Sequence, residues 1–310
     1  MMERQKIIID TDPGIDDAMA IHYAFAHPRL EVMGLTTIFG NVFVEQATRN
    51  ALFLTEQAKQ HIPVSEGAKH PLRMPPNPPS HYVHGHEGFG TLPAPKPTRK
   101  PDPRPAHVFL SETLRAHSGE IILCPVGPLT NIAKLLEYDA EIIHHVKKLV
   151  IMGGAVDCAG NVTAHAEANI WNDPDAAEAV FAADWQIELI GLDVTSHITC
   201  NAEDFRQVAS AAPVIGGFLE KITAFYINFY HSIMSRHVCL LHDPAALVSV
   251  TDPSAFEYED IPLGVITQGE EIGATRPVDH RRAVRVAKFV DAEMVRKKFL
   301  DICGQCDTIN

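Results

Sequence analysis

Residues 6–18 read KIIIDTDPGIDDA, and this stretch decides the fold of the chain. The apolar run Ile7–Ile9 predicts a buried strand. Pro13 and Gly14 are typical of a tight turn, because proline presets φ at the second position and glycine tolerates a positive φ at the third. From Asp16 onwards the apolar residues recur at helical spacing. A strand, a turn and a helix in this order predict the opening of an α/β fold.

Four aspartates surround this turn. Asp10 and Asp12 are two residues apart on the strand, so they lean to the same side. Asp16 and Asp17 begin the helix, where the helix dipole favours negative charge. Four converging carboxylates repel one another unless a cation lies among them, and oxygen ligands favour Ca²⁺ or Mg²⁺ over zinc or copper. The alternative is a capped helix with solvated aspartates, but this spacing after a buried strand favours the metal site.

The rest of the chain continues the alternation of strands and helices. Further strands are expected at 30–39, 62–64, 121–126, 149–152, 187–194, 261–266 and 283–290, with helices at 44–60, 107–117, from about 130, after Pro174, within 205–236, after Pro244 and at 291–300. This order predicts an α/β fold with an open, Rossmann-like, mostly parallel sheet flanked by helices. No repeat or shift in composition indicates a second domain, so residues 1–310 are expected to form one.

Residues 71–105 interrupt this alternation of strands and helices. They contain half of the 22 prolines of the chain, which excludes a regular helix or a central strand. Three histidines, His81, His84 and His86, lie in the middle of the segment. Because a second pair of ligands is missing nearby, we interpret the segment as a substrate-facing loop and not as a zinc site.

Composition and charge exclude several classes of partner. The 310 residues carry a formal net charge of −13, which argues against a nucleic-acid backbone or an anionic membrane as partner. No apolar run is as long as a transmembrane helix and the N-terminus lacks the apolar core of a signal peptide, so a cytoplasmic protein is expected. Cys303 and Cys306 have no matching strand or second pair, and they are expected to be two thiols in a tail.

Polar residues recur where the predicted strands end. Besides the aspartates, these are Asn41, Thr130 with Asn131, Met152 followed by two glycines, the polar run 161–173, and His242 with Asp243. In open α/β sheets the ligand lies beyond the carboxyl ends of the strands, so these clusters are expected to meet at one edge. The sequence therefore predicts a site at the C-terminal ends of the strands.

Seven of these motifs, in this order, resemble those of the inosine-uridine preferring nucleoside hydrolase family. They are Asp10–Ala18, Gly40-Asn41, His84–Gly88, Gly127–Asn131, Met152–Gly154, Glu167–Asn169 and His242–Pro244. The resemblance covers nearly the whole chain and implies hydrolysis of a ribonucleoside to ribose and free base. It also implies a homodimer or homotetramer. Ala168 stands where family members often carry an aromatic residue, so the resemblance does not predict whether the base is a purine or a pyrimidine.

The resemblance also implies a role for individual residues. Ca²⁺ would be held by Asp12, Asp17, Asp243 and the backbone carbonyl of Thr130, and Asp12 would also be the general base. Asp16 and Asn169 would bind ribose hydroxyls, Asn41 would lie beside the attacking water, Asn161 and Glu167 would bind the 5′-hydroxyl, and Met152 would pack near the sugar. His84 and His242 would face the leaving base, with His242 as its acid. Tyr230 could face the core or the ligand, and we include it among the substrate-binding candidates.

The chemistry of these groups agrees with the implied roles. Carboxylate and amide oxygens stabilise the positive charge that develops on the sugar, and a histidine is suited to protonate the leaving base. Two alternatives stay open at this point. Asp10-Thr-Asp12 after an apolar strand also resembles the haloacid-dehalogenase-like phosphatases, with Asp10 as nucleophile. A non-catalytic nucleoside-binding protein is the other.

Overall fold

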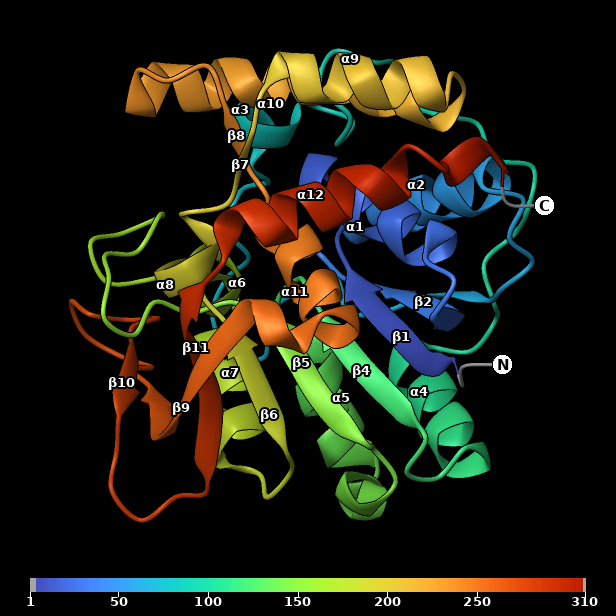
Figure 1. The fold of residues 1–310 in the computed structure, drawn as a ribbon. Helices are drawn as coiled ribbons and strands as arrows, with labels where there is room; N and C mark the ends of the chain where they lie inside the picture. Colours follow the sequence, from blue (N-terminus) through green and yellow to red (C-terminus); the bar gives the residue numbers. More distant parts are fainter. Residues whose placement is uncertain (1–3, 309–310) are drawn as a thin grey trace.

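A nine-stranded sheet forms the centre of residues 4–308, the part of the chain that the computed structural model describes (Figure 1). The strands lie in the order β10 (Thr275–Pro277), β9 (Phe256–Val265), β11 (Ala283–Val290), β6 (Ile187–Ile190), β5 (Lys148–Met152), β4 (Ile121–Pro125), β1 (Gln5–Thr11), β2 (Leu30–Thr37) and β3 (Val64–Glu66). All neighbours from β11 to β3 pair in parallel, whereas β9 pairs antiparallel with β11 and β10. The prediction of an open, mostly parallel, Rossmann-like sheet is confirmed.

The strand order reverses between β1 and β4. From this point the chain adds β2 and β3 in one direction and β5 and β6 in the other. Such a reversal leaves a crevice beyond the carboxyl ends of the two central strands. Asp12 follows β1 and Val126 follows β4, so both residues lie at this crevice.

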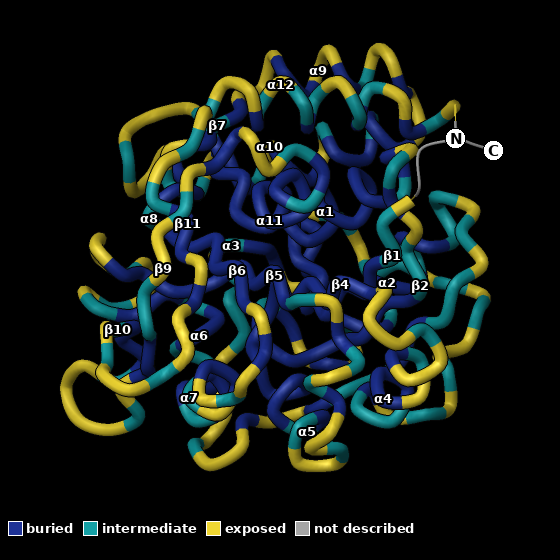
Figure 2. Tube along the Cα trace, turned by 60° about the horizontal axis from the view of Figure 1, so that its bottom comes forward, coloured by how far each residue is buried: buried dark blue, intermediate teal, exposed yellow. Residues whose placement is uncertain are grey.

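Helices cover both faces of the sheet (Figure 1). Side chains alternate along β1, so Ile8 packs in one apolar cluster and Ile7 and Ile9 pack in the other. The Ile8 cluster includes α4 (Ala106–Ala116), α5 (Thr130–Tyr138) and α7 (Pro174–Ala182), and the opposite cluster includes α1 (Ile15–Ala26), α11 (His242–Thr251) and α12 (Ala292–Cys303). The central strands are buried between these layers (Figure 2). No helix within residues 4–308 is long and apolar enough to cross a membrane.

Helix α1 begins directly after the turn at Pro13 and Gly14. The Asp17 carboxylate accepts the backbone N–H of Gly14 at 2.9 Å and thereby satisfies a donor at the start of the helix. Asp16 and Asp17 both lie in its first turn, where the dipole favours their charge. The same local chemistry that starts the helix therefore places two carboxylates at the crevice.

The proline-rich segment 71–105 contains one helical turn, α3 (His81–His84), where the sequence predicted no regular helix. This turn packs under α10 (Ile215–Met234), and the ring centroids of Tyr82 and Phe229 lie 5.9 Å apart (Figure 1). A single turn fits between the prolines because none of them falls within residues 81–84. His84 is thereby held at the cavity beyond the carboxyl edge of the sheet.

Several further elements differ from the prediction. The strand predicted at 187–194 ends at Ile190, and the short helix α8 (Leu192–Thr195) follows Gly191. A short, mostly apolar run cannot be assigned to strand or helix by periodicity alone, which explains the error. The three-residue edge strand β10 was not predicted. The remaining elements are α2 (Val44–Gln57), α6 (Ala168–Asn172), α9 (Ala202–Ala211), and β7 (Thr199–Cys200) paired with β8 (Cys239–Leu240).

The thiols of Cys303 and Cys306 lie at the end of α12, where both are buried and free. The Cys306 thiol donates to the backbone oxygen of His22, with sulfur and oxygen 3.7 Å apart. Burial raises the pKa of the Cys303 thiol well above its usual value, which is typical of unreactive structural thiols. These two cysteines therefore pack the C-terminal helix against α1.

Candidate active site

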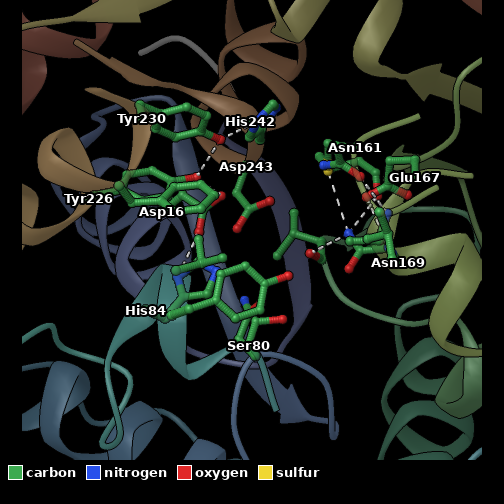
Figure 3. A pocket seen from close by; sticks show the side chains of 18 of the residues that line it. Asp16, Ser80, His84, Asn161, Glu167, Asn169, Tyr226, Tyr230, His242 and Asp243 are labelled. Atoms are coloured by element: carbon green, nitrogen blue, oxygen red, sulfur yellow. Dashed lines mark hydrogen bonds and ion pairs between the residues drawn. The ribbon is translucent and has the colours of Figure 1, made fainter. Parts of the chain in front are cut away.

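Every predicted substrate-binding residue lines one cavity of about 130 Å³ at the crevice (Figure 3). The predicted ligand Asp243 and the predicted acid His242 line it as well. Figure 3 shows two sides of this cavity, with Asn161, Glu167 and Asn169 on one side, His84, Tyr226, Tyr230 and His242 on the other, and Asp243 between them. Three predicted site residues do not line the cavity, and these are Asp12, Asp17 and Thr130.

Carboxylates gather at the bottom of this cavity. One oxygen each of Asp16, Asp17 and Asp243 lie within 4.8 Å of one another, and all three residues are buried. Burial raises the pKa of Asp16 to about 6, and burial together with the charge of Asp16 raises the pKa of Asp243 well above its usual value. Among residues 4–308, no donor hydrogen-bonds to the Asp243 carboxylate. Such a cluster is stable in its ionised form only when a cation compensates it.

Asp12 lies beside this cluster with one oxygen free. Its Oδ2 accepts the backbone N–H of Asn41 at 2.6 Å, whereas its buried Oδ1 has no partner. A Cβ at Gly40 would lie 2.1 Å from Oδ2, and a Cβ at Gly127 would lie 2.7 Å from Oδ1. The two glycines are therefore required for the carboxylate to fit. Burial and the charge of Asp17 raise the pKa of Asp12 well above its usual value.

The Asp17 carboxylate is held by four donors. Oδ1 accepts from the Thr11 hydroxyl at 2.5 Å and from the Asp12 N–H at 3.2 Å, and Oδ2 accepts from the Gly14 N–H at 2.9 Å and from Asn41 Nδ2 at 3.0 Å. Burial still raises its pKa, although the bonds from Thr11 and Gly14 act in the opposite direction. Asp17 is therefore fixed in orientation, and Asn41 connects it to Asp12.

The structure places Thr130 away from the cavity. It is the first residue of α5, and its hydroxyl donates to Asp173 Oδ2 at 2.6 Å. Val126, four residues earlier and directly after β4, does line the cavity. Its backbone oxygen accepts from Asn169 Nδ2 at 3.0 Å and so lies at the crevice. Of these two residues, only Val126 therefore lines the cavity.

The side of the cavity opposite the histidines is built around Glu167. Its carboxylate accepts the backbone N–H groups of Gly154, Asn169 and Ile170 at 2.9, 2.9 and 3.2 Å. Asn169 Nδ2 donates to the backbone oxygens of Val126 and Met152, so its own carbonyl oxygen is left for a ligand. Rigid acceptors of this kind suit the hydroxyl groups of a sugar.

A chain of hydrogen bonds crosses the opposite side. The Tyr226 hydroxyl donates to Asp16 Oδ2 at 3.1 Å and lies 3.3 Å from the Tyr230 hydroxyl. The Tyr230 hydroxyl in turn lies 2.9 Å from His242 Nε2, and His242 Nδ1 lies 2.8 Å from the Thr195 hydroxyl. Burial lowers the pKa of His242 to about 4, so the imidazole is neutral at pH 7. These hydrogen-bonded tyrosine, histidine and threonine side chains are uncharged, and they can hold a proton or pass it along.

His84 enters the cavity from α3 as a neutral ring. Its Nδ1 accepts the backbone N–H of Ile15 at 3.1 Å, which places the ring proton on Nε2. Burial lowers its pKa to about 4. Although Nδ1 also lies 3.7 Å from Asp16 Oδ1, the two groups form no ion pair at neutral pH. His84 therefore offers a hydrogen-bond donor to the cavity.

Several site residues were not predicted from the sequence. Tyr226 precedes Tyr230 by one helical turn, and two tyrosines at this spacing on one face of a helix were a usable signal. Tyr82, Phe229 and Ser80 also line the cavity. Thr195 gave no signal, because its role depends on packing against a residue 47 positions away.

Comparison with known proteins agrees with this geometry. The model of the family described as "Inosine-uridine preferring nucleoside hydrolase" matches residues 7–297. The chain belongs to this family. The nucleoside hydrolase fold is also found among solved structures, and the plant nucleoside hydrolase PpNRh1 superimposes with a TM-score of 0.93 at 36% identity, covering 96% of this chain and 98% of that chain.

Other nucleoside hydrolases are similar over most of their length. Uridine nucleosidase 1 of Arabidopsis thaliana is 39% identical over 88% of this chain and 82% of its own length. The non-specific ribonucleoside hydrolase RihC of Salmonella paratyphi C is 38% identical over 88% of this chain and 87% of its own. A purine-preferring ribonucleoside hydrolase from Gardnerella vaginalis superimposes with a TM-score of 0.92 at 33% identity, covering 98% and 100% of the two chains. The chain is therefore a nucleoside hydrolase.

Proposed function

We propose that this nucleoside hydrolase binds a ribonucleoside with its sugar over the acidic cluster and its base against the tyrosine–histidine chain. Water then replaces the base at the anomeric carbon, giving ribose and free base. One observation carries the proposal. A single cavity joins the buried carboxylates of Asp16 and Asp243, which cluster with Asp17, to a neutral hydrogen-bonded histidine, His242.

The acidic cluster fits a hard divalent cation, and we propose Ca²⁺. Asp12, Asp17 and Asp243 would hold it, and the backbone ligand is assigned to Val126 in place of Thr130. The unpartnered Oδ1 of Asp12 and the raised pKa values of the cluster support this assignment. When bound, such an ion lowers the pKa of water and offers positions for sugar hydroxyls.

We assign each site residue of this chain a separate role in the reaction. Asp12 Oδ1 accepts the proton of the attacking water, which Asn41 helps to place. Asp16 and Asn169 bind the sugar hydroxyls, Asn161 and Glu167 bind the 5′-hydroxyl, and Met152 packs against the sugar. The carboxylates around the ring stabilise the positive charge of an oxocarbenium-like transition state.

The departing base needs a proton, which the opposite side of the cavity can supply. His242 Nε2 and the Tyr230 hydroxyl share a hydrogen bond, so either atom can release a proton towards the base. Negative charge developing on the base raises the pKa of the His242 imidazole, so the ring can take up a proton and pass it to the base, whose own affinity for the proton rises as it leaves. Tyr226 and Thr195 orient the two groups, and His84 Nε2–H offers a second donor.

The two alternatives are less well supported. The phosphatase alternative, with Asp10 as nucleophile, is not favoured by the match to the nucleoside hydrolase family. Asp10 Oδ1 accepts from Thr36 and Asn131, so Asp10 serves the strand packing below the site. A mere nucleoside-binding protein has no need for the free Oδ1 of Asp12. Release of reducing sugar from a panel of uridine, inosine, cytidine, adenosine and guanosine, with calcium and with EDTA, decides between hydrolase and binder and also gives the base preference.

Calcium is expected to stabilise the protein, and more so as the pH rises. Asp16 has its pKa raised from 3.8 to about 6, so in the ion-free protein its ionisation costs stability as the pH rises through this interval. Calcium removes this cost, and the gain in Tm over EDTA should grow from near zero at pH 5 to roughly 5 °C at pH 7.5. Differential scanning fluorimetry measures both series.

Comparing calcium with EDTA at each pH isolates the effect of the carboxylates. The lowered pKa values of His84 and His242 act in the opposite direction, because they stabilise the fold as the pH rises from about 4 towards 6.5. This contribution is present in both series and cancels in the difference. A gain in Tm that is the same at every pH would contradict the assignment of the cluster to the ion.

Tyr82 is expected to contribute to base binding. Its side chain is 68% exposed beside Phe229 and lines the cavity, so its ring is free to stack on a base. Tyr82→Ala should raise KM for uridine or inosine roughly tenfold with little change in kcat, since stacking is worth about 1–3 kcal/mol per base. Tyr138→Ala, at an exposed position outside the cavity, is the control and should leave KM unchanged.

Two further proposals concern the whole protein. We place it in the cytoplasm and expect a homodimer or homotetramer. Fluorescence microscopy of a tagged protein in its own cells tests the first, and light scattering coupled to size exclusion tests the second. A membrane-associated or monomeric protein would contradict them.

A further inference from the structure

Helix α2 holds two catalytic segments together from outside the cavity. The first is the aspartate turn (residues 12–17), which carries three of the four aspartates, and the second is the histidine loop (residues 84–90), which carries His84. No residue of α2 lines the cavity. Any effect of α2 on the reaction is therefore indirect, through the segments that it contacts.

The contact between the segments depends on the side-chain amide of Asn50. Asn50 is fully buried in α2, and its Nδ2 donates one N–H to the backbone oxygen of Pro13 at 3.0 Å and the other to that of Glu87 at 2.8 Å. Its Oδ1 accepts from the guanidinium of Arg49 at 3.1 Å. One amide thus bridges the aspartate turn and the histidine loop, and all of its hydrogen-bonding groups are used.

The two segments meet without room for other side chains. A Cβ at Gly88 would lie 2.7 Å from both Asn50 Nδ2 and the Pro13 oxygen, and Gly88 has a positive φ of 87°. A Cβ at Gly14 would lie 2.5 Å from His84 Nδ1. The backbone of the aspartate turn therefore packs directly against the backbone of the histidine loop, with the Asn50 amide between them. This contact sets the position of His84.

Two other side chains of α2, Gln46 and Arg49, contact the histidine loop. Gln46 Nε2 donates to the backbone oxygen of His86 at 3.0 Å, and Arg49 forms an ion pair of 2.8 Å with the Glu87 carboxylate. Neither side chain reaches the aspartate turn. Among these residues of α2, Asn50 is distinguished by its bond to Pro13.

We propose that Asn50 is a positioning residue that fixes the histidine loop against the aspartate turn and so sets the distance between His84 and the acidic cluster. The proposal rests on the proposed function for its effect on catalysis. Displacement of a positioned group by about 1 Å can cost a factor on the order of 100 in rate. Asn50→Leu and Asn50→Asp, which keep the size of the side chain but remove both N–H donors, should lower kcat/KM for uridine 10- to 100-fold by this mechanism.

A double-mutant cycle with His84 separates positioning from general packing. If Asn50 acts by placing His84, then Asn50→Leu should cost little further activity in a His84→Ala background. Gln46→Met is the matched control, because it removes an anchor of the same loop without breaking the bridge, and it should retain activity within about twofold. Losses that multiply in the double variant would overturn the proposal.

Hydrogen exchange tests the bridge independently of activity. In Asn50→Leu or Asn50→Asp, peptides that cover residues 12–17 and 84–90 should exchange faster, while those of β5 and α5 stay as in the unmodified protein. Unchanged exchange in the two segments, or faster exchange throughout the chain, would overturn the proposal. If the unmodified protein hydrolyses no nucleoside, the proposed function fails while the exchange result still decides whether the bridge exists.

Discussion

Asp12→Asn is expected to lower kcat for hydrolysis of uridine or inosine by a factor on the order of 1,000 or more, because it removes the proposed base and a ligand charge together. The substitution keeps the size of the side chain and an oxygen to accept the Asn41 N–H, so the turn should keep its shape. The substitution also removes one of the four buried carboxylate charges that repel one another, which are those of Asp12, Asp16, Asp17 and Asp243. In EDTA the Tm of the variant should therefore equal or exceed that of the unmodified protein. Steady-state release of reducing sugar and scanning fluorimetry measure the two effects.

The control for Asp12→Asn is the same substitution at an aspartate outside the cavity. Asp301 is exposed on α12, and Asp301→Asn should keep kcat within about twofold, as is usual for surface substitutions. A kcat near that of the unmodified protein in Asp12→Asn would remove Asp12 as the base. Loss of activity together with a large fall in Tm would mean that the carboxylate supports the fold instead.

His242→Ala should slow the hydrolysis of inosine and uridine about 100- to 1,000-fold, which is the usual contribution of a general acid. It should slow that of para-nitrophenyl riboside by only a few fold, since para-nitrophenolate leaves without a proton. The difference between the substrates is the expected signature of an acid acting on the leaving group. Measuring kcat/KM for both on the same preparation removes errors in enzyme concentration.

A surface histidine provides the comparison for His242. His144 is exposed, and its substitution by alanine should affect neither substrate. Equal losses on the natural nucleosides and on the nitrophenyl riboside would show that His242 holds the cavity together and does not donate the proton. Tyr230→Phe, which removes the hydroxyl bonded to His242 Nε2, should reproduce part of the selective loss.

Local sequence signals predicted most of the fold. The strand, turn and helix of residues 6–18 were readable because apolar runs, turn residues and helix-capping aspartates all indicate the same structure there. The sequence signal was ambiguous at 187–194, where Gly191 separates a strand from a short helix within one mostly apolar stretch. It was absent for β10, whose three residues are held by pairing with β9.

The site was predicted less completely than the fold. The rule that ligands lie beyond strand ends brought distant motifs together, and it placed His242 and Asp243 correctly beside Asp16. The resemblance implied the Thr130 carbonyl as a ligand, and the sequence offered no check on it, because a backbone carbonyl leaves no trace in the identity of its side chain. The partners of His242 were equally hidden, since Thr195 meets it through folding alone.

The two sides of the cavity come from different parts of the chain. Groups assigned to the sugar stand on the strand ends and on residues 161–169, whereas Tyr226, Phe229 and Tyr230 share the single helix α10. A chimaera that receives α10 and α3 from another member of the family should therefore take on the nucleobase preference of that member. Its groups assigned to the sugar stay unchanged.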